Sequence, residues 1–581
     1  MDVVKKLEEN LKKSLLTLGI EREVLIEIPN DDSHGEYSCN IALQVSKELK
    51  KSPREVAEEI VSNLENIEEI EKVEVAGPGF INFYISNTYL LNVLKEVKEK
   101  GDEYGKSNIL DGKKVVVEYT DANPFKVLHI GHLYSNSVGE ALSRLLGTSG
   151  ADVTRACYQG DVGLHVAKCL WGLEEIFDRD SKSMGELSKE NLVEKVKYLG
   201  DAYTYGYDYY DTKKDKTAIK EIGRLNRYIF SLVMNVPEED FSDLEKKNMK
   251  EIYEVTKKWS LDYLDTIYKR VGTKFDRLYF EGEVGEKGLE VVLANIGKIF
   301  EKDDGAIIYR GDEKKGLHTR VFVNQQGIPT YEAKEIGLAL LKHDEFQYDE
   351  SIVITADEQA GYFNVVLDAF AKIYPDIAKR IKHMPHGMVK LPGMKKMSSR
   401  KGGILSAEWL IDETRKRTLA VMKGEKDKGI AEKIAIAAIK YAYLKVSIGR
   451  DIAFDFDQVI SFDGDTGSYL LYVYARCRSI LNEAKIKGVL NENILENVYT
   501  RDLVKQISKY DSIVLNSSQN YSPSTLCQYL FDLGQSFSVF YQNVNVLNSK
   551  EKEGLISVLE ATAQVMRNGL DILGIGVVEK M

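Results

Sequence analysis

Two histidines separated by an isoleucine and a glycine, His129-Ile130-Gly131-His132, form the motif in this chain that points most clearly to chemistry. They follow a short β-branched run, 115–119, and precede apolar residues at helical spacing from Leu133 onward, so we expect a strand-to-helix turn. A helix N-terminus offers free N–H groups and a positive dipole end to phosphate, and Gly131 would allow a nucleotide close to the backbone. As a lone tetrapeptide the motif is weak.

A second segment, Lys395 to Gly403, combines four cations with two serines and two glycines. Such a small-residue, basic loop suits gripping a transferring triphosphate, where positioning and charge stabilisation do most of the work. An exposed basic loop without a particular role explains the segment equally well when it is considered alone.

The elements that must position both motifs alternate between strands and amphipathic helices. We predict strands at 115–119, 152–158, 321–323 and 352–356, and helices at 133–146, 164–177, 331–342 and through Phe370. This alternation predicts an α/β fold with a doubly wound, Rossmann-like parallel sheet that binds ligands at the carboxyl ends of its strands. A polar segment, about 180–300, is predicted to be an insertion, and its five tyrosines between Tyr203 and Tyr210 are better explained by packing than by base stacking.

Smaller units flank this region on both sides. The first hundred residues predict a small α/β domain with helices at 3–18 and 53–64 and strands at 73–75 and 80–85. After about residue 430 the strands vanish, and helical spacing continues at 430–446, 467–487, 503–515 and 555–573. We therefore predict an N-terminal domain at 1–106, a catalytic domain at 107–460 and an all-α domain at 461–581.

Composition limits the classes of protein that remain. The 581 residues are 43% apolar and 29% charged, which is typical of globular proteins and excludes a disordered chain. Five scattered cysteines without a CxxC pair favour reduced thiols and no structural zinc. We see no secretory signal and no apolar run of membrane-spanning length, so we expect a cytosolic protein without a membrane partner.

The net charge of −12 argues against a nucleic-acid partner, but the charge is unevenly distributed. Between Lys372 and Lys401 nine lysines or arginines face one acid, Asp376. That stretch could hold a polyanion, although charge alone favours a solvated face.

Together the two motifs resemble the HIGH and KMSKS signatures of class I aminoacyl-tRNA synthetases, and the closer resemblance is to the arginyl-tRNA synthetase family. It covers essentially the whole chain and also rests on 77–83 (GPGFINF), 117–126 (VEYTDANPFK), 160–163 (GDVG), 386–389 (HGMV) and 467–476 (GSYLLYVYAR). Residues 160–163 resemble the family's GDWG, with Val162 in place of the tryptophan.

The resemblance implies ATP-dependent ligation of L-arginine to tRNA(Arg) through an arginyl-adenylate, with Mg²⁺ and without zinc. It implies that His129, Gly131 and His132 serve ATP, with Lys396, Met397, Ser398 and Lys401 closing from the basic loop. The fourth KMSKS position is Ser399 rather than lysine. Family members that lack this lysine commonly carry one where Lys126 stands, so we expect Lys126 to supply the missing cation.

A guanidinium is planar, permanently charged and best bound by carboxylates. The resemblance assigns arginine to Glu118, Asn123, His129, Tyr331, Glu335 and Gln359. Tyr331 and Glu335 stand four residues apart and so share one helix face, whereas the family usually has aspartate where this chain has Glu335. Without the family, each would be better explained as a solvated carboxylate or a core tyrosine.

For tRNA, stacking and polar contacts to unpaired bases are expected. Tyr469, Tyr472 and Arg476 are candidates in the all-α domain, although core packing explains the tyrosines nearly as well, and Phe80 and Asn82 would face the tRNA elbow by resemblance. The alternatives are a class I ligase for another amino acid and a non-catalytic tRNA-binding paralogue. We expect a monomer.

Overall fold

Five parallel strands form the central sheet of the computed structural model, which describes residues 3–581 except 28, 30–33, 235, 237–240, 392–404 and 423–426. The strands are β4 (Lys114–Glu118), β5 (Asp152–Gln159), β6 (Arg277–Phe280), β10 (Glu350–Ala356) and β11 (Ile381–His386). Their order is β11-β10-β4-β5-β6, with every neighbouring pair parallel. The chain thus runs outward from β4 to one edge and resumes at β10 on the other side. This confirms the doubly wound sheet, whose switch point lies between β4 and β10.

Two details of the predicted sheet are wrong, and its edge strand β11 was not predicted. The range 180–300 is not a single insertion, because β6 lies within it and pairs with β5. The predicted strand at 321–323 exists as β9 (Arg320–Val323), but it belongs to a separate antiparallel sheet with β7 (Glu301–Asp303) and β8 (Ala306–Tyr309). A short apolar run looks the same in either kind of sheet, since only its partners decide the pairing.

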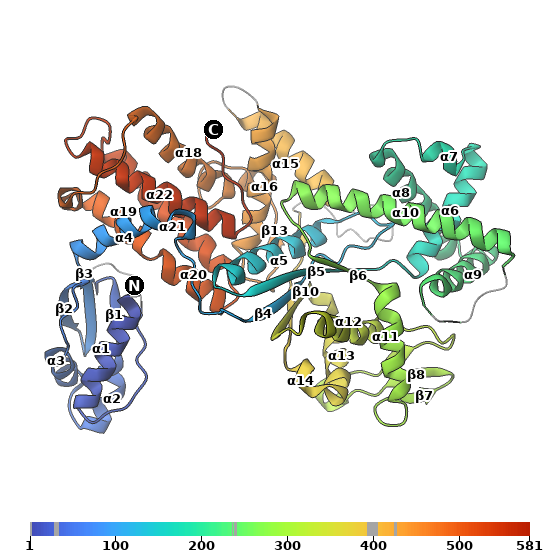
Figure 1. Ribbon diagram of the computed structural model, residues 1–581, viewed down its shortest axis with the longest axis horizontal. Coiled ribbons are helices and arrows are strands. Elements are labelled where there is room, and N and C mark those ends of the chain that lie inside the picture. Colours follow the sequence, from blue (N-terminus) through green and yellow to red (C-terminus); the bar gives the residue numbers. More distant parts are fainter. Residues whose placement is uncertain are drawn as a thin grey trace.

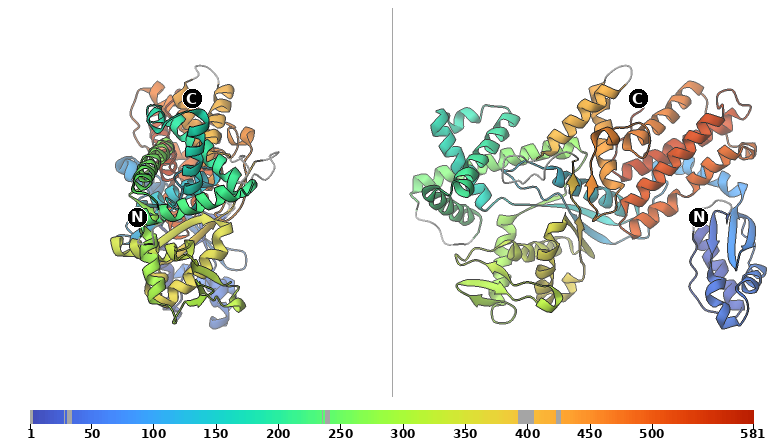
Figure 2. Two further views of the ribbon diagram at one scale, coloured as in Figure 1. Left: turned by 90° about the vertical axis from the view of Figure 1, so that its right-hand side faces the viewer. Right: turned by 180° about the vertical axis from the view of Figure 1, so that it is seen from behind.

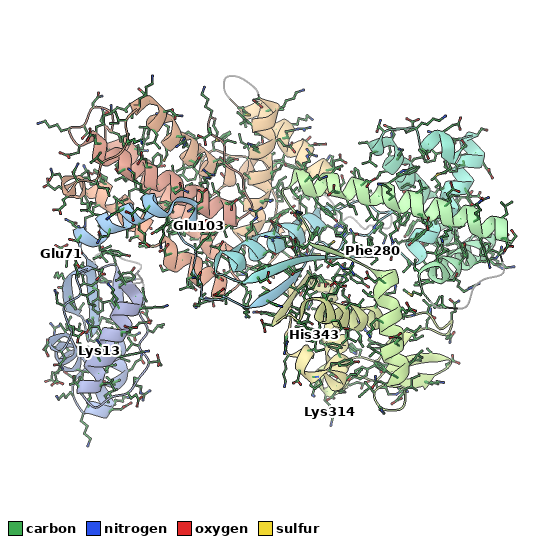
Figure 3. All side chains as sticks on the ribbon, in the orientation of Figure 1. Lys13, Glu71, Glu103, Phe280, Lys314 and His343 are labelled. Atoms are coloured by element: carbon green, nitrogen blue, oxygen red, sulfur yellow. The ribbon has the colours of Figure 1, made fainter. Side chains whose placement is uncertain are left out.

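Helices of the first insertion form a lobe beside the sheet, at the right of Figure 1. They are α6 (Leu164–Asp180), α7 (Met184–Leu187), α8 (Leu192–Tyr207), α9 (Lys216–Val233) and α10 (Asp243–Arg270). The lobe has its own apolar core, against which Tyr203, Tyr205, Tyr209 and Tyr210 are partly buried. Figure 3 labels Phe280, the last residue of β6, near the centre of the molecule where the sheet meets this lobe.

Two helices pack together in the second insertion, which is the segment of the chain between β6 and β10. α11 (Glu281–Ala294) follows β6 directly, and α12 (Tyr331–Phe346) precedes β10. The helices touch backbone to backbone, because a Cβ on Gly337 would lie 2.0 Å from the Val284 carbonyl oxygen. After β10 come α13 (Ala360–Ile373) and α14 (Pro375–Ala378). α12 is therefore held rigidly beside the carboxyl end of β4.

The N-terminal unit contains α1 (Val3–Thr17), β1 (Tyr37–Cys39), α2 (Ile41–Leu49), α3 (Pro53–Ser62), β2 (Ile70–Ala76) and β3 (Phe80–Ile85). The predicted cap of α3 is present, with Ser52 and Glu55 bonded reciprocally. α4 (Asn87–Lys100) behaves differently, since Lys98 Nζ donates to the Gly488 carbonyl at 2.8 Å and Asn568 donates to the Gly101 carbonyl at 2.9 Å. α4 thus packs on the helical domain rather than on the unit with which the sequence grouped it.

The helical domain lies against the sheet on the side away from the insertion lobe (Figure 2). Its elements, with those that lead into it, are α15 (Ala407–Val421), α16 (Lys428–Leu444), α17 (Phe456–Val459), α18 (Gly467–Ala484), α19 (Val498–Ser508), α20 (Tyr510–Gln519), α21 (Pro523–Asn543) and α22 (Lys552–Ile572). The predicted helix 503–515 is in fact two helices that meet at Lys509.

All five cysteines are buried and free. Burial raises the pKa of Cys39 to about 11 and that of Cys169 to about 12. In the part of the chain that the structure describes, no helix is long and apolar enough to cross a membrane.

Candidate active site

The two histidines cap their own helix. α5 (Ile130–Thr148) starts directly after His129, whose Nδ1 accepts the N–H groups of Gly131 at 3.1 Å and His132 at 3.4 Å. His132 Nδ1 in turn accepts the His129 N–H at 3.2 Å, and the two rings stack at 3.6 Å. Those two helix N–H groups are therefore occupied by a side chain, and are not free for phosphate as the sequence suggested.

This reciprocal cap fixes the protonation of both rings. An imidazole whose Nδ1 accepts a hydrogen bond carries its proton on Nε2. Burial lowers the pKa of His129 to about 4, and burial together with His129 lowers the pKa of His132 well below its usual value. Both rings are thus neutral at pH 7 and present Nε2–H donors.

Residues 405–407, which follow the basic segment in the sequence, bind to this turn. The Ile130 N–H donates to the Leu405 carbonyl at 3.1 Å, and the Ala407 N–H donates to the Leu128 carbonyl at 2.8 Å. The predicted ATP contacts of the loop itself, together with Ser399, lie outside the described residues; they are Lys396, Met397, Ser398 and Lys401. The described chain resumes at Leu405, just before α15.

The segment between β4 and α5 has an unusual backbone. Thr120, Asp121 and Phe125 have φ of 77°, 47° and 65°, a left-handed conformation that side chains rarely adopt and that often marks functional segments. Hydrogen bonds to β5 and the residue after it hold it in place: Asp121 accepts the Tyr158 N–H at 2.9 Å, and Asn123 Oδ1 accepts the Gly160 N–H at 2.8 Å. The side-chain oxygen of Asn123 is thereby used, while its amide nitrogen is left to donate.

Three acidic side chains, Glu118, Asp121 and Glu335, interact electrostatically at the carboxyl end of β4, and we call them the carboxylate cluster. Glu118 is 1% exposed and its Oε2 lies 2.6 Å from Nζ of Lys342, which is 2% exposed. Burial, and then repulsion from Glu118, raise the pKa of Glu335 to about 8 and that of Asp121 well above its ordinary value. One ammonium therefore faces three acids, and the cluster favours a further cation.

Asp121 and Lys342 were not selected from the sequence. Asp121 lies within the family-like segment 117–126, and Lys342 stands seven residues after Glu335, two helical turns along the same face of α12. The signal available in the sequence was a lysine on the same predicted helix face as Glu335.

A second group of charges lies beside the histidines. Lys126 is partly buried and has no ion-pair partner among the described residues; burial lowers its pKa, and Glu281 opposes that shift. Glu281 is paired with Lys334 at 2.6 Å, and each side chain is 5% exposed. Lys126 also contributes to the lowered pKa of both His129 and His132, so it lies within electrostatic range of the turn.

The other two predicted arginine contacts are more open. Tyr331 is 59% exposed at the start of α12, with Lys334 Nζ 5.1 Å from its ring centre. Gln359 is exposed in the single turn between β10 and α13. Gln359 follows the carboxyl end of β10, whereas Tyr331 lies within electrostatic range of Glu281, the first residue of α11. Neither belongs to the carboxylate cluster.

The side chains predicted to contact tRNA differ in how far they are exposed. Tyr469 is buried and bonded to Ser538 at 2.9 Å, while Tyr472 is 42% exposed. The Arg476 guanidinium lies 4.6 Å from the ring centre of Tyr541. In the N-terminal unit, Asn82 is buried and accepts from Ser38 at 2.8 Å, whereas Phe80 is partly buried. Tyr472 is the candidate most open to a ligand.

The sheet switches between β4 and β10, and the histidine-capped helix that follows β4 is bonded at its start to residues 405–407; this is the architecture of a class I aminoacyl-tRNA synthetase. Family models agree along the chain: "tRNA synthetases class I (R), catalytic domain" matches residues 93–456, "Arginyl tRNA synthetase N terminal domain" 3–85, and "DALR anticodon binding domain" 470–581. The chain belongs to the arginyl-tRNA synthetase family, the ligases that join arginine to tRNA at the expense of ATP.

Individual relatives show the same match over the full length. The arginine–tRNA ligase of Clostridium perfringens is 30% identical, and the alignment covers 100% of both chains. That of Fusobacterium nucleatum is also 30% identical and covers 100% of this chain and 98% of its own. The solved arginyl-tRNA synthetase of Thermus thermophilus, 22% identical with 100% of both chains covered, has the same fold at a TM-score of 0.79.

Proposed function

We propose that the carboxylate cluster binds the guanidinium of arginine, and that arginyl-adenylate forms between the cluster and the capped histidines. The observation that carries this proposal is the excess of buried acid: Glu118, Asp121 and Glu335 interact with one another and have Lys342 as their cation. A substrate guanidinium would supply the missing positive charge and could bind two oxygens at once. Asn123, His129, Tyr331 and Gln359 are proposed to hold the rest of arginine.

In the first step an arginine carboxylate oxygen attacks the α-phosphorus of ATP, and the bond to the leaving pyrophosphate breaks. In the second, a hydroxyl of the terminal tRNA ribose attacks the arginyl carbonyl carbon, and AMP leaves. Side chains have little bond chemistry to perform here, so positioning and stabilisation of phosphate charge dominate. Two neutral Nε2–H donors, on His129 and His132, support this role, with Gly131 giving close access.

We propose that the phosphates are further held by Lys126 and by the loop residues Lys396, Met397, Ser398 and Lys401. Lys126 is suited to the task because it is partly buried beside the histidines without an ion-pair partner among the described residues. Mg²⁺ is expected to accompany ATP. Within the described ranges no three His, Cys, Asp or Glu side chains are placed so that they could hold a metal ion, so the protein offers no cage of its own there.

We propose that tRNA binds across the flanking domains, with Tyr472 as the most exposed candidate and with Arg476, Tyr469, Phe80 and Asn82 in supporting positions. The proposed domains are 1–106, 107–460 and 461–581, with the packing of α4 favouring an earlier first boundary. We also propose a cytosolic monomer, which light scattering and cell fractionation would test.

The decisive experiment is arginine-dependent exchange of pyrophosphate into ATP, with and without cognate tRNA, on the wild-type chain and Glu335→Gln. Glutamine has nearly the shape of the protonated carboxyl but cannot ionise. We expect the arginine KM to rise by about a hundredfold or more, as when a buried charge loses its partner, while the ATP KM changes little. By family resemblance, exchange should require tRNA. An unchanged arginine KM would place Glu335 outside the arginine site.

A further inference from the structure

We propose that Lys342 is a positioning residue that sets the charge of the carboxylate cluster, so that the cluster accepts one guanidinium and rejects its neutral isostere. This inference rests on the proposed binding of arginine by the cluster. It concerns a lysine that would not itself touch ATP or tRNA.

The first support is geometric. Lys342 projects from α12 two turns beyond Glu335, and α12 is packed beside β4. Its Nζ lies 2.6 Å from Oε2 of Glu118, with both side chains almost fully buried. The contact fixes one oxygen of Glu118 at the strand end and ties the helix that carries Glu335 to the strand that carries Glu118.

The second support is the balance of charge around this pair. Lys342 is the cation that stabilises the ionised forms of both Asp121 and Glu335. The other groups interacting with Glu118 or Glu335 are an acid or neutral hydroxyls: Glu281 from α11, Tyr158 from β5, Tyr279 from β6, Tyr348 before β10 and Tyr362 from α13. Neighbouring acids cannot all ionise without a compensating cation. Lys342 therefore opposes the rise in the pKa of Asp121 and Glu335, and without it both carboxyls would hold their protons more firmly.

A purely structural ion pair is the competing explanation. Buried pairs seldom stabilise a fold more than apolar residues of the same size would, so stability alone is a weak reason for this one. The chain also offers a matched comparison: Lys440 is 1% exposed and donates to the Gly574 carbonyl at 2.7 Å, at the interface with the helical domain. Replacing either lysine removes a buried ammonium, but only Lys342 faces the cluster.

The experiment measures arginine, citrulline and ATP binding calorimetrically between pH 6 and 9, for the wild-type chain, Lys342→Met and Lys440→Met. Citrulline is the probe because its urea group has the shape of a guanidinium without the charge. In Lys342→Met at pH 7 we expect arginine to bind about a hundredfold more weakly, with partial recovery by pH 9 as the cluster ionises. Citrulline and ATP affinities should change by less than threefold, and Lys440→Met should bind arginine like the wild type.

A Lys342→Met chain that binds arginine within threefold of the wild type, with the same pH profile, would overturn the role of Lys342. Should that variant not fold, Lys342→Gln keeps a hydrogen bond to Glu118 without the charge and is expected to lose the same arginine affinity; wild-type affinity in it would equally overturn the inference. Failure of the wild-type chain itself to bind arginine would instead overturn the proposed function.

Discussion

Glu335, which stands where the family usually has aspartate, makes the charge of the carboxylate cluster depend on pH. Its pKa is raised to about 8, first by burial and then by Glu118. At pH 7 the carboxyl is therefore mostly protonated, and a bound guanidinium would stabilise its ionised form. Arginine binding and proton release are thus linked.

We accordingly expect arginine binding at pH 7 to release about one proton, and arginine affinity to fall by about tenfold per pH unit below pH 8 until the pKa of the bound state is reached. Calorimetry in buffers of different ionisation enthalpy measures the proton directly. Glu335→Gln serves as the control and should release none. An observed enthalpy independent of the buffer would contradict the linkage.

Lys126 carries a second prediction at this scale. If it replaces the loop cation missing at Ser399, then Lys126→Ala should lower kcat for adenylate formation by roughly 10²–10³, the usual effect of removing one preorganised electrostatic group. The arginine KM should change little, because the interaction strengthens mainly in the transition state.

Two further variants sharpen that measurement. Lys258→Ala, which removes an exposed lysine of α10 paired with Asp262, should leave kcat unchanged. Adding Ser399→Lys to Lys126→Ala should restore part of the rate. A Lys126→Ala enzyme within a few-fold of the wild type would leave the missing cation unexplained.

Residue types and spacing predicted the histidine turn, but not the hydrogen bonds that its side chains make. Nothing in the tetrapeptide indicates that each Nδ1 will accept a backbone N–H of the same turn, because this depends on side-chain rotamers. Asp121 and Lys342 were missed for a related reason. Their importance lies in burial, in the repulsion of Asp121 by Glu118 and Glu335, and in the attraction of Lys342 for these acids. These interactions arise only when β4 and α12 come together.

At the scale of elements, the contact between the histidine turn and the start of α15 is the most consequential. Ala407 is the first residue of α15, where proline is tolerated in a helix, and Ser406 has the extended backbone, φ −73° and ψ 150°, that a following proline requires. Ala407→Pro therefore removes the hydrogen bond to Leu128 while leaving α15 able to form.

We expect Ala407→Pro to cost about 1 kcal/mol of stability and to slow adenylate formation by roughly tenfold, since the start of α15 would lose its register against the histidine turn. Ala407→Val is the matched control, because it adds bulk at the same buried position and keeps the N–H. Stopped-flow and thermal unfolding compare the two. Equal rates in both variants would show that the bond has no part in catalysis.

The helices and strands also differ in how well the sequence predicts them. Helices such as α1, α6 and α12 and the strands with buried β-branched runs were predicted almost at their observed bounds, because burial on one face imposes a period. The long helices α10 and α21 were not predicted. β6 was missed since its four residues include an arginine and two aromatics within a polar stretch, and β9 was assigned to the wrong sheet. Hydrogen-bond partners, which the local pattern does not carry, decide both cases.

At the scale of the whole molecule, α4 decides where the N-terminal unit can be cut. Its apolar side chains Leu90, Val93, Leu94 and Val97 are buried, and the helix packs on α19 and α22. We expect a chain starting at Asn87 to melt close to the full-length temperature, whereas one starting at Ser107 should lose several kcal/mol, at about 1.5–3 kcal/mol for each apolar side chain exposed. Circular dichroism measures both. Equal melting of the two chains would place the boundary after α4.

Unlike the N-terminal unit, the helical domain cannot be deleted without disturbing the rest of the fold. Deleting the chain after residue 460 is the obvious test of whether tRNA charging needs this domain while ATP binding does not. However, Lys440 donates to Gly574 and Arg144 pairs with Asp571 at 3.1 Å across the interface. Tyr521 also bonds Glu350 at 2.7 Å, at the amino end of β10. We therefore expect the truncated chain to aggregate, so point variants of Tyr472 or Arg476 are the better probes of tRNA binding.

The five buried thiols make the enzyme suited to site-specific labelling. A thiol reacts as its thiolate, and burial with a raised pKa suppresses that form, so maleimide dyes should leave the native chain unlabelled. A cysteine introduced on the exposed surface of the N-terminal unit and another on the insertion lobe would then carry a donor and an acceptor dye. Fluorescence transfer between them would report, molecule by molecule, whether these two outlying parts draw together when tRNA binds.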